Sequence, residues 1–249
     1  MRKTERCGFA LCICLLMLVQ SLYFAPIKAE AKNDSQDFIR GVDISTLDML
    51  EKLGAKYYSK GKQEDALKIL HANGANYVRL KIWVDPRNEN GEPYGGGNND
   101  YATTLRLAKR ANALDMKILL DFHYSDFWAD PANQIKPKSW KDLSQNNLKK
   151  KIYFYTRDTL NDFAKEGIYP SMVQIGNEIS SGILHDNGKV GNGQSFQQLA
   201  DLLGFAIAGV RASSDRNAKV VLHLDQGGKN ELYRWYFDSL LAENPKLDF

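Results

Sequence analysis

A candidate catalytic pair follows a short apolar run near the middle of the chain. Val173-Gln174-Ile175-Gly176 leads directly into Asn177 and Glu178. A carboxyl group partly shielded from water can hold its proton near neutral pH and deliver it to a leaving oxygen, as cleavage of a glycosidic bond requires. Asn177 can donate a hydrogen bond to a sugar hydroxyl beside the reacting carbon. A solvated glutamate after a strand is the alternative interpretation, because Asn-Glu pairs are common.

Residues 119–131 form a second candidate segment, in which aromatic and acidic side chains alternate beyond another apolar run. Flat aromatic rings stack on the apolar faces of sugar rings, and carboxylates accept hydrogen bonds from sugar hydroxyls. We therefore expect His123, Asp126 and Trp128 to bind a saccharide, with a core position as the alternative for Trp128. Phe122 and Phe127 are expected in the core. The chain has four histidines and no His-Glu-x-x-His motif, so a catalytic zinc site is not expected.

Four more candidate ligand-binding residues lie in or just after other apolar runs. Arg79 lies within such a run, and a buried arginine must be paired, so we expect it to face carboxylates and to lower the pKa of an ionised one. A purely structural ion pair is the alternative. Trp83 ends the same run, and Asp43 and Asp225 end the first and last runs. Residues 91–100 include three consecutive glycines without a following Gly-Lys-Ser/Thr, which favours an active-site loop over a phosphate loop.

The elements that must position these residues alternate between strand and helix. Short apolar runs predict strands, and longer segments with apolar residues every three or four positions predict helices. The predicted strands are Phe38–Ile44, Asn76–Trp83, Lys117–Phe122, Met172–Ile175 and Lys219–Leu224. The predicted helices are Gln63–Asn73, residues 101–115, residues 145–166, a stripe from Phe196 to Val210, and Asn230–Glu243.

Repeated strand–helix units demand a mostly parallel sheet, either an open doubly wound sheet or a (β/α)8 barrel. No Gly-x-Gly-x-x-Gly follows the first predicted strand, and polar residues gather at the carboxyl end of every strand, which favours the barrel. Closing a barrel takes eight strands, and only about five βα units are present. We therefore expect residues 32–249 to be the N-terminal part of one catalytic barrel, in a truncated chain.

The N-terminal segment has the pattern of a secretory signal peptide. Arg2, Lys3 and Arg6 precede an apolar run, and Ala29-Glu30-Ala31 suits a signal peptidase, so residues 1–31 are expected to be removed. A membrane anchor is the alternative. The three cysteines all lie in this leader, so the remaining chain can form no disulfide. Its net charge is about +1, which gives no electrostatic reason to bind nucleic acid or acidic membranes. We expect a secreted, extracellular protein.

Taken together, these motifs resemble the endo-β-1,4-galactanases of glycoside hydrolase family 53, which belong to a large clan of retaining barrel enzymes. The similarity spans essentially residues 39–249, and the long motif after the third strand is far more specific than Asn-Glu alone. The residues that carry it are Arg79–Trp83, Pro93–Asp100, Leu120–Pro131, Val173–Glu178 and His223–Asp225.

The resemblance implies cleavage inside the β-1,4-galactan chains of pectic arabinogalactan, with retention of configuration. It implies that Glu178 is the general acid/base, that Asn177 is its partner, and that the nucleophile is a glutamate on a seventh strand beyond the end of this chain. It implies no cofactor or metal in this segment, and calcium sites in later loops. The expected partner is the polysaccharide alone, bound by a monomer.

Two other functions stay open at this point. Asn177-Glu178 alone also fits barrel glycosidases of other specificity, such as mannanases and xylanases. Because the expected nucleophile is missing, an inactive fragment that binds sugar without hydrolysing it fits as well. We also expect the isolated 249-residue chain to be poorly soluble and inactive, because a sheet of five strands cannot close into a barrel.

Overall fold

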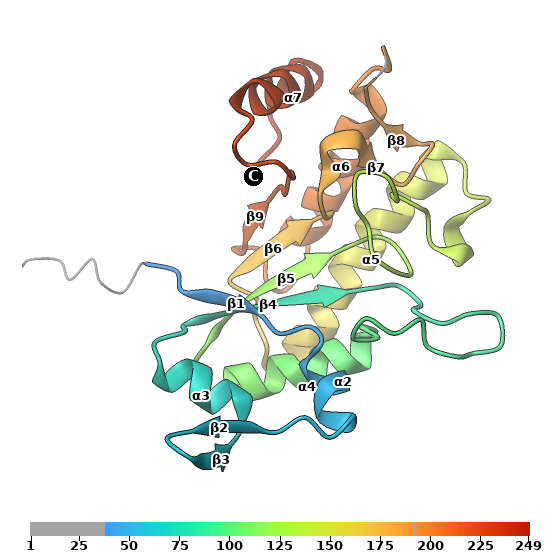
Figure 1. Ribbon diagram of the computed structural model, residues 1–249. Helices are drawn as coiled ribbons and strands as arrows, with labels where there is room; N and C mark the ends of the chain where they lie inside the picture. The colour runs from blue at the N-terminus through green and yellow to red at the C-terminus, as the bar shows by residue number, and fades with distance from the viewer. Residues whose placement is uncertain (1–37, 192) are drawn as a thin grey trace, which may run out of the picture. The chain divides into compact units, whose positions relative to one another are not determined.

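The computed structural model describes residues 38–191 and 193–249, and the predicted signal peptide lies outside them. A parallel sheet of five strands forms the centre of residues 39–249 (Figure 1). Each strand pairs with the next one along the chain, so the order never reverses, as it does in a doubly wound sheet. This order is that of successive βα units in a barrel. The strands are β1 (Gly41–Asp43), β4 (Tyr77–Ile82), β5 (Lys117–Phe122), β6 (Met172–Ile175) and β9 (Lys219–Val221).

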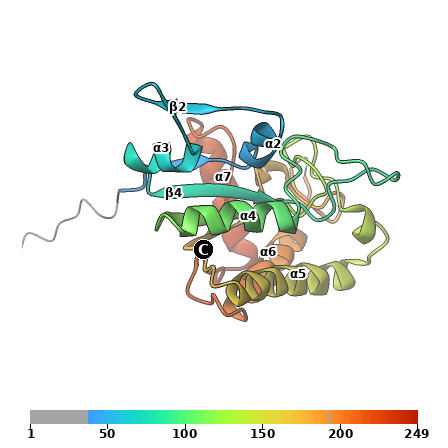
Figure 2. The same ribbon diagram turned by 90° about the horizontal axis from the view of Figure 1, so that it is seen from below.

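Helices connect the strands and pack on the sheet and on one another. Helix α4 lies alongside β4 and β5, and α5 packs along α6 (Figure 2). Figure 1 shows the strands in front of α5 and α6. The helices are α2 (Leu47–Lys52), α3 (Ala66–Ala72), α4 (Tyr101–Asn112), α5 (Gln145–Lys165), α6 (Gln197–Arg211) and α7 (Asn230–Glu243). Short elements in the loops are β2 (Tyr57–Ser59), β3 (Lys62–Glu64), η2 (Lys138–Trp140), η3 (Ile179–Ser181), β7 (Gly182–Ile183) and β8 (Gly188–Lys189).

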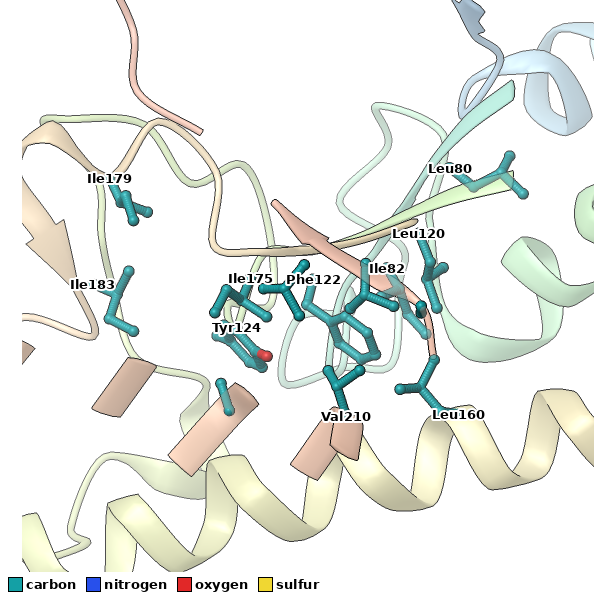
Figure 3. Packing of buried hydrophobic residues seen from close by; sticks show 14 of the residues in the cluster. Leu80, Ile82, Leu120, Phe122, Tyr124, Leu160, Ile175, Ile179, Ile183 and Val210 are labelled. Atoms are coloured by element: carbon teal, nitrogen blue, oxygen red, sulfur yellow. The ribbon is translucent and has the colours of Figure 1, made fainter. Parts of the chain in front are cut away.

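One face of each strand is apolar and packs against the helices. In β4, the alternate residues Val78, Leu80 and Ile82 are buried, as the two-residue period of a strand requires. Figure 3 shows side chains of β4, β5 and β6 gathered near Val210 of α6 and Leu160 of α5. Burial of these apolar side chains fixes which face of each strand turns toward the helices.

The opposite face of the sheet carries polar side chains on its three central strands, β4, β5 and β6. Arg79 and Lys81 alternate with the apolar residues of β4, and register places Lys81 beside Asp121 and Asp121 beside Gln174. Because register neighbours in a parallel sheet point to the same side, these side chains meet over the open face. The predicted candidate Arg79 therefore shares this face of the sheet with Lys81, Asp121 and Gln174.

The main departure from the predicted elements lies before β4. The helix predicted over Gln63–Asn73 begins only at Ala66, since the carboxylate of Asp65 caps it by accepting from Leu67 N and Lys68 N. The preceding residues form the hairpin β2–β3, whose two-residue turn has positive φ at Lys60 and Gly61. The helix α2 was also not predicted, whereas β5, β6 and α7 have the predicted bounds.

Within the part of the chain that the structure describes, no helix has the length and apolar character needed to cross a membrane.

Candidate active site

Arg79 is the centre of the polar network on the open face of the sheet. Its Nη1 lies 2.8 Å from Asp43 Oδ2 and its Nη2 lies 2.7 Å from Asp121 Oδ2. Nη2 also donates to Asn177 Oδ1 at 2.7 Å, and Nε donates to Gln174 Oε1 at 3.2 Å. The guanidinium of Arg79, in β4, therefore bonds to side chains of β1, β5 and β6 and to Asn177 just after β6. The expectation that Arg79 pairs with carboxylates is confirmed.

Asp43 carries a second cation besides Arg79. Lys81 Nζ lies 2.6 Å from Asp43 Oδ2, and Ser45 N donates to Asp43 Oδ1 at 3.0 Å. Burial alone would raise the pKa of the Asp43 carboxyl, but the hydrogen bond and charge of Lys81, together with Ser45, lower it to about 2. Asp43 is therefore an anion at neutral pH, and it compensates two cations at the rim of the sheet.

Asp121 and His123 form a buried pair beneath this rim. The backbone N–H of Ala129 donates to His123 Nδ1 at 3.1 Å, so Nδ1 carries no proton and Nε2 must be the donor. Nε2 then donates to Asp121 Oδ2 at 3.0 Å, and Gln174 Nε2 donates to Asp121 Oδ1 at 2.7 Å. Both side chains are essentially inaccessible, and the pair anchors the loop after β5 to the sheet.

Asn177 is held from three sides. Its Oδ1 accepts from Arg79 Nη2 at 2.7 Å and from Gln174 Nε2 at 3.5 Å and lies 2.9 Å from His223 Nδ1, while its Nδ2 donates to Ala129 O at 2.6 Å. Because Arg79 and Gln174 both donate to Oδ1 and Ala129 O accepts one Nδ2 hydrogen, the other Nδ2 hydrogen is left for a ligand. The amide is therefore a fixed hydrogen-bond donor beside Glu178.

Glu178 combines a constrained backbone with a free carboxylate. It is half-buried, and its φ and ψ of 50° and 53° lie in the left-handed region, which costs a non-glycine residue about 1–3 kcal/mol. Gln134 Nε2 donates to Asn177 O at 2.8 Å and to Glu178 O at 3.3 Å, and Ile179 N donates to His223 O at 2.8 Å. Of the described side chains, none donates a hydrogen bond to the Glu178 carboxylate, which is thus available to a ligand.

Two side chains after β9 lie beside this pair. His223 lies in direct contact with Asn177, and burial followed by the charge of Arg79 lowers the pKa of His223, so its imidazole is neutral at neutral pH. Burial raises the pKa of Asp225, but hydrogen bonds from Ser180 Oγ and Gln226 Nε2 outweigh it and lower the pKa. Asp225 is therefore an anion, held by Ser180 of the loop after β6 and by Gln226 of its own loop.

An aromatic group borders the network on the side of β4 and β5. Lys81 Nζ lies 4.7 Å from the centre of the Trp128 ring, and Trp83 packs edge-on against Trp128 with ring centres 5.8 Å apart. Gly96 has a φ of 63°, and a Cβ there would lie 2.9 Å from Trp128 Nε1 and 3.3 Å from the Trp83 ring. Only glycine lets the loop pass this close to the two indoles.

The structure brings together most of the candidates but gives them different surroundings. Arg79 is bonded to both Asp43 and Asn177, Glu178 follows Asn177 in the chain, and the exposed Trp128 contacts Lys81 of the same network. Three others present almost no surface to a ligand: Trp83 and His123 are 1% exposed, and Asp126 accepts backbone hydrogen bonds from Asp85 and Lys138. In the structure these three residues support the loop after β5. Their contact with a ligand stays a prediction.

The prediction for Phe127 is wrong. It was expected in the core with Phe122, yet its side chain is 36% exposed, whereas Phe122 is fully buried. Phe127 follows the end of β5 by five residues, where the two-residue alternation of the strand no longer determines which side chains turn inward.

Sequence reasoning missed Lys81, Asp121, Gln174 and His223 as members of the site. The signal was present, because each lies an even number of residues from a candidate on its own strand or strand extension. Lys81 is two residues from Arg79, Asp121 is two from His123, and His223 is two from Asp225. No group of three or more His, Cys, Asp or Glu side chains suited to a metal ion occurs in the described part of the chain.

Comparison with known sequences identifies the relatives of this chain. The model of glycosyl hydrolase family 53 matches residues 39–249. The chain is 39% identical to an endo-beta-1,4-galactanase of Bacillus subtilis, over 89% of this chain and 49% of that protein. It is also 39% identical to an arabinogalactan endo-beta-1,4-galactanase of Humicola insolens, over 83% of this chain and 59% of that protein. The chain thus spans about half to three-fifths of the length of these relatives.

Solved structures agree with the sequence matches. The GH53 catalytic domain of Ignisphaera aggregans superposes with a TM-score of 0.79 and 42% identity, covering 85% of this chain and 57% of that one. A fungal beta-1,4-galactanase superposes with a TM-score of 0.76 and 36% identity, covering 84% and 60%. With the strand order, these matches confirm the predicted (β/α)8-barrel class, of which the described residues hold five parallel strands. The chain belongs to glycosyl hydrolase family 53.

Proposed function

We propose that the complete gene product is a retaining endo-β-1,4-galactanase that hydrolyses pectic galactan, with Glu178 as general acid/base. The observation that carries the proposal is the free, half-buried carboxylate of Glu178 beside the fixed amide of Asn177, at the carboxyl end of β6. The relatives named as galactanases support the substrate.

In the proposed reaction each of these side chains has one role. The carboxyl group of Glu178 protonates the glycosidic oxygen as the bond breaks, and the resulting carboxylate then deprotonates the attacking water. The remaining Nδ2 hydrogen of Asn177 donates to a sugar hydroxyl, while the hydrogen bonds with Arg79 and with the carbonyl of Ala129 keep the amide from turning. Trp128 offers an exposed aromatic ring at the border of the same region.

A retaining reaction needs a second carboxylate about 5–5.5 Å from the first. Asp43 and Asp121 are both ion-paired with Arg79, and Asp121 is also fully buried, so neither is suited to attack a sugar carbon. Asp225 is held by Ser180 and Gln226. We therefore assign the nucleophile to a residue outside the described part of the chain, on a further strand of the barrel.

The experiment is hydrolysis of potato β-1,4-galactan by the complete gene product, with mannan and xylan as controls. Glu178→Gln should lower the rate by a factor of about 100 to 10,000, the usual contribution of a general acid/base, while galactan is still bound. Glu166→Gln is the matched control, because Glu166 is an exposed glutamate at the end of α5. Wild-type rates in Glu178→Gln would refute the assignment of Glu178 as general acid/base. Faster hydrolysis of mannan or xylan than of galactan would refute the proposed specificity. If the unmodified protein binds galactan without hydrolysing it, a sugar-binding protein would be favoured.

We also propose that the protein is secreted and acts outside the cell as a monomer. The pattern of residues 1–31 supports export, since a basic start, an apolar run and Ala29-Glu30-Ala31 follow one another. The mass of the protein in the culture medium tests this, because cleavage after Ala31 leaves Lys32 as the first residue. A protein that retains its leader and stays with the cells would contradict the proposal.

A further inference from the structure

The loop between β5 and α5 borders a cleft. This cleft has a volume of about 630 Å³, within the range of ordinary small-ligand sites. One wall comes from the loop after β5, and Tyr94 of the loop between β4 and α4 closes the other side. The lining residues are Tyr94, Ser125, Asp126, Phe127, Trp128, Asp130, Asn133, Ile135, Lys136 and Lys138.

The apolar surface of the cleft is mostly aromatic and exposed. Tyr94 is 42%, Phe127 36% and Trp128 39% exposed. Tyr94 and Phe127 meet edge-on with ring centres 5.6 Å apart, and the buried Trp83 supports Phe127 from below at 5.1 Å. Rings held rigidly by other rings can accept a flat apolar ligand face with little loss of side-chain entropy.

The charged side chains of the cleft are already compensated. Lys138 Nζ lies 3.4 Å from Asp85 Oδ2 and bonds to the carbonyl of Arg87, and Lys136 Nζ donates to Asn187 Oδ1 at 2.8 Å. The two oxygens of Asp126 accept from the backbone N–H groups of Asp85 and Lys138.

Asp130 is satisfied in the same way, by Ala132 N, Asn133 N and Asn133 Nδ2. Because no cation in the cleft lacks a partner among the described residues, an acidic sugar would gain no free counterion here. The combination of exposed rings and compensated charges therefore favours a neutral sugar.

The same loop joins the cleft to the candidate active site. Ala129 O accepts from Asn177 Nδ2, and Gln134 Nε2 donates to the carbonyls of Asn177 and Glu178. Trp128 belongs to both regions, since it lines the cleft and also contacts Lys81 of the polar network. A polysaccharide lying beside Glu178 can therefore extend over the exposed ring of Trp128 toward those of Phe127 and Tyr94.

We propose that this cleft is a remote saccharide subsite, which binds a neutral sugar unit of the same polysaccharide whose bond is cleaved beside Glu178. The inference rests on the proposed function. Such a subsite increases affinity for long chains, since binding at a distance from the reacting bond adds to the total interaction with the polymer. Short substrates that do not reach the cleft gain nothing from it.

The test compares long and short substrates in single variants of the complete gene product. In Phe127→Ala and in Tyr94→Ala, the ratio of the KM for polymeric β-1,4-galactan to the KM for a chromogenic galactobioside should rise about tenfold, the value of one lost aromatic contact. Phe154→Ala is the matched control, because Phe154 is an exposed phenylalanine on α5, and its ratio should equal that of the wild type. Circular dichroism verifies that each variant is folded.

Affinity electrophoresis of Glu178→Gln, with and without Phe127→Ala, measures binding apart from turnover. Galactan in the gel should retard the first protein more strongly than the second, and polygalacturonate should retard neither. Unchanged KM ratios in both aromatic variants, or equal retardation with and without Phe127→Ala, would overturn the subsite. Retardation by polygalacturonate would overturn its neutral specificity. Failure of the unmodified protein to hydrolyse galactan would instead refute the proposed function, and the subsite with it.

Discussion

Replacement of Arg79 tests whether the polar network holds the sheet together. Arg79→Met keeps an unbranched side chain of similar reach but removes the guanidinium and all its hydrogen bonds. Asp121, whose side chain is 0% exposed, then keeps His123 and Gln174 as its partners among the described residues. Asp43 keeps Lys81 as a partner and remains partly exposed, so the lost ion pair between Arg79 and Asp43 contributes much less to the loss of stability.

The expected magnitude follows from the burial of Asp121. Removing one partner of a buried ion pair costs about 3–5 kcal/mol, because the other charge is left uncompensated. Gln174 and His123 still donate hydrogen bonds to Asp121, so we expect a loss near the lower end, about 3 kcal/mol. Such a loss is a large share of the 5–15 kcal/mol by which a typical domain is stable.

Urea unfolding followed by tryptophan fluorescence gives the free energy of unfolding of the complete gene product. The midpoint should fall while the dependence on denaturant stays the same, since the surface exposed on unfolding is unchanged. Arg106→Met is the matched control, because Arg106 pairs with Asp48 at the surface, and we expect about 0–1 kcal/mol there. Equal losses in the two variants would refute the view that Arg79 compensates a buried charge.

Two further predictions concern the same region. Asp43→Asn should lower the free energy of unfolding by about 1–2 kcal/mol at neutral pH, since the folded pKa of Asp43, about 2, lies below its ordinary 3.8. This contribution is fully present above 3.8 and is lost as the pH falls through 2, so a difference between variant and wild type that persists below pH 2 would contradict it. Gly96→Ala and Gly95→Ala both place a side chain at positive φ, which should cost about 1 kcal/mol in each, and Gly96→Ala should cost more because its Cβ would also lie 2.9 Å from Trp128 Nε1. Only Gly96→Ala should shift the tryptophan emission spectrum, because a Cβ at position 95 meets nothing within 4 Å, and identical spectra would argue against the packing on Trp128.

The order of strands and helices could be predicted from periodicity because each element has a long or uniform signal. Helix α7 has its predicted bounds, Asn230–Glu243, and β5 and β6 also have theirs, although one polar residue, Asp121 or Gln174, lies within the apolar run of each strand. The hairpin β2–β3 could not be read in the same way. Its strands have three residues each, too few to establish a period of two, and Lys60-Gly61 is a weaker turn signal than Asn-Gly.

The membership of the polar network was harder to predict than its location. Gln174 lies between Val173 and Ile175 and looks like one polar interruption of a buried strand. Its role follows from partners that are distant in sequence, because its amide joins Asp121 to Arg79 across two strand pairings. Sequence alternation gives the face of a residue, but only the sheet register gives its neighbours.

The backbone conformation of Glu178 could not be predicted from the sequence for a different reason. Glutamate has no preference for the left-handed region, so nothing in its identity indicates a φ of 50°. The conformation is imposed by neighbours: Gly176 has a φ of 88° where a Cβ would lie 2.5 Å from Ile179, and Gln134 binds the carbonyls on both sides of the Asn177–Glu178 junction. The backbone strain and the hydrogen bonds that hold it occur at the residue with a free carboxylate. They direct that carboxylate to a position that an unstrained turn after β6 would not give it, and this ties the local conformation to the proposed chemistry.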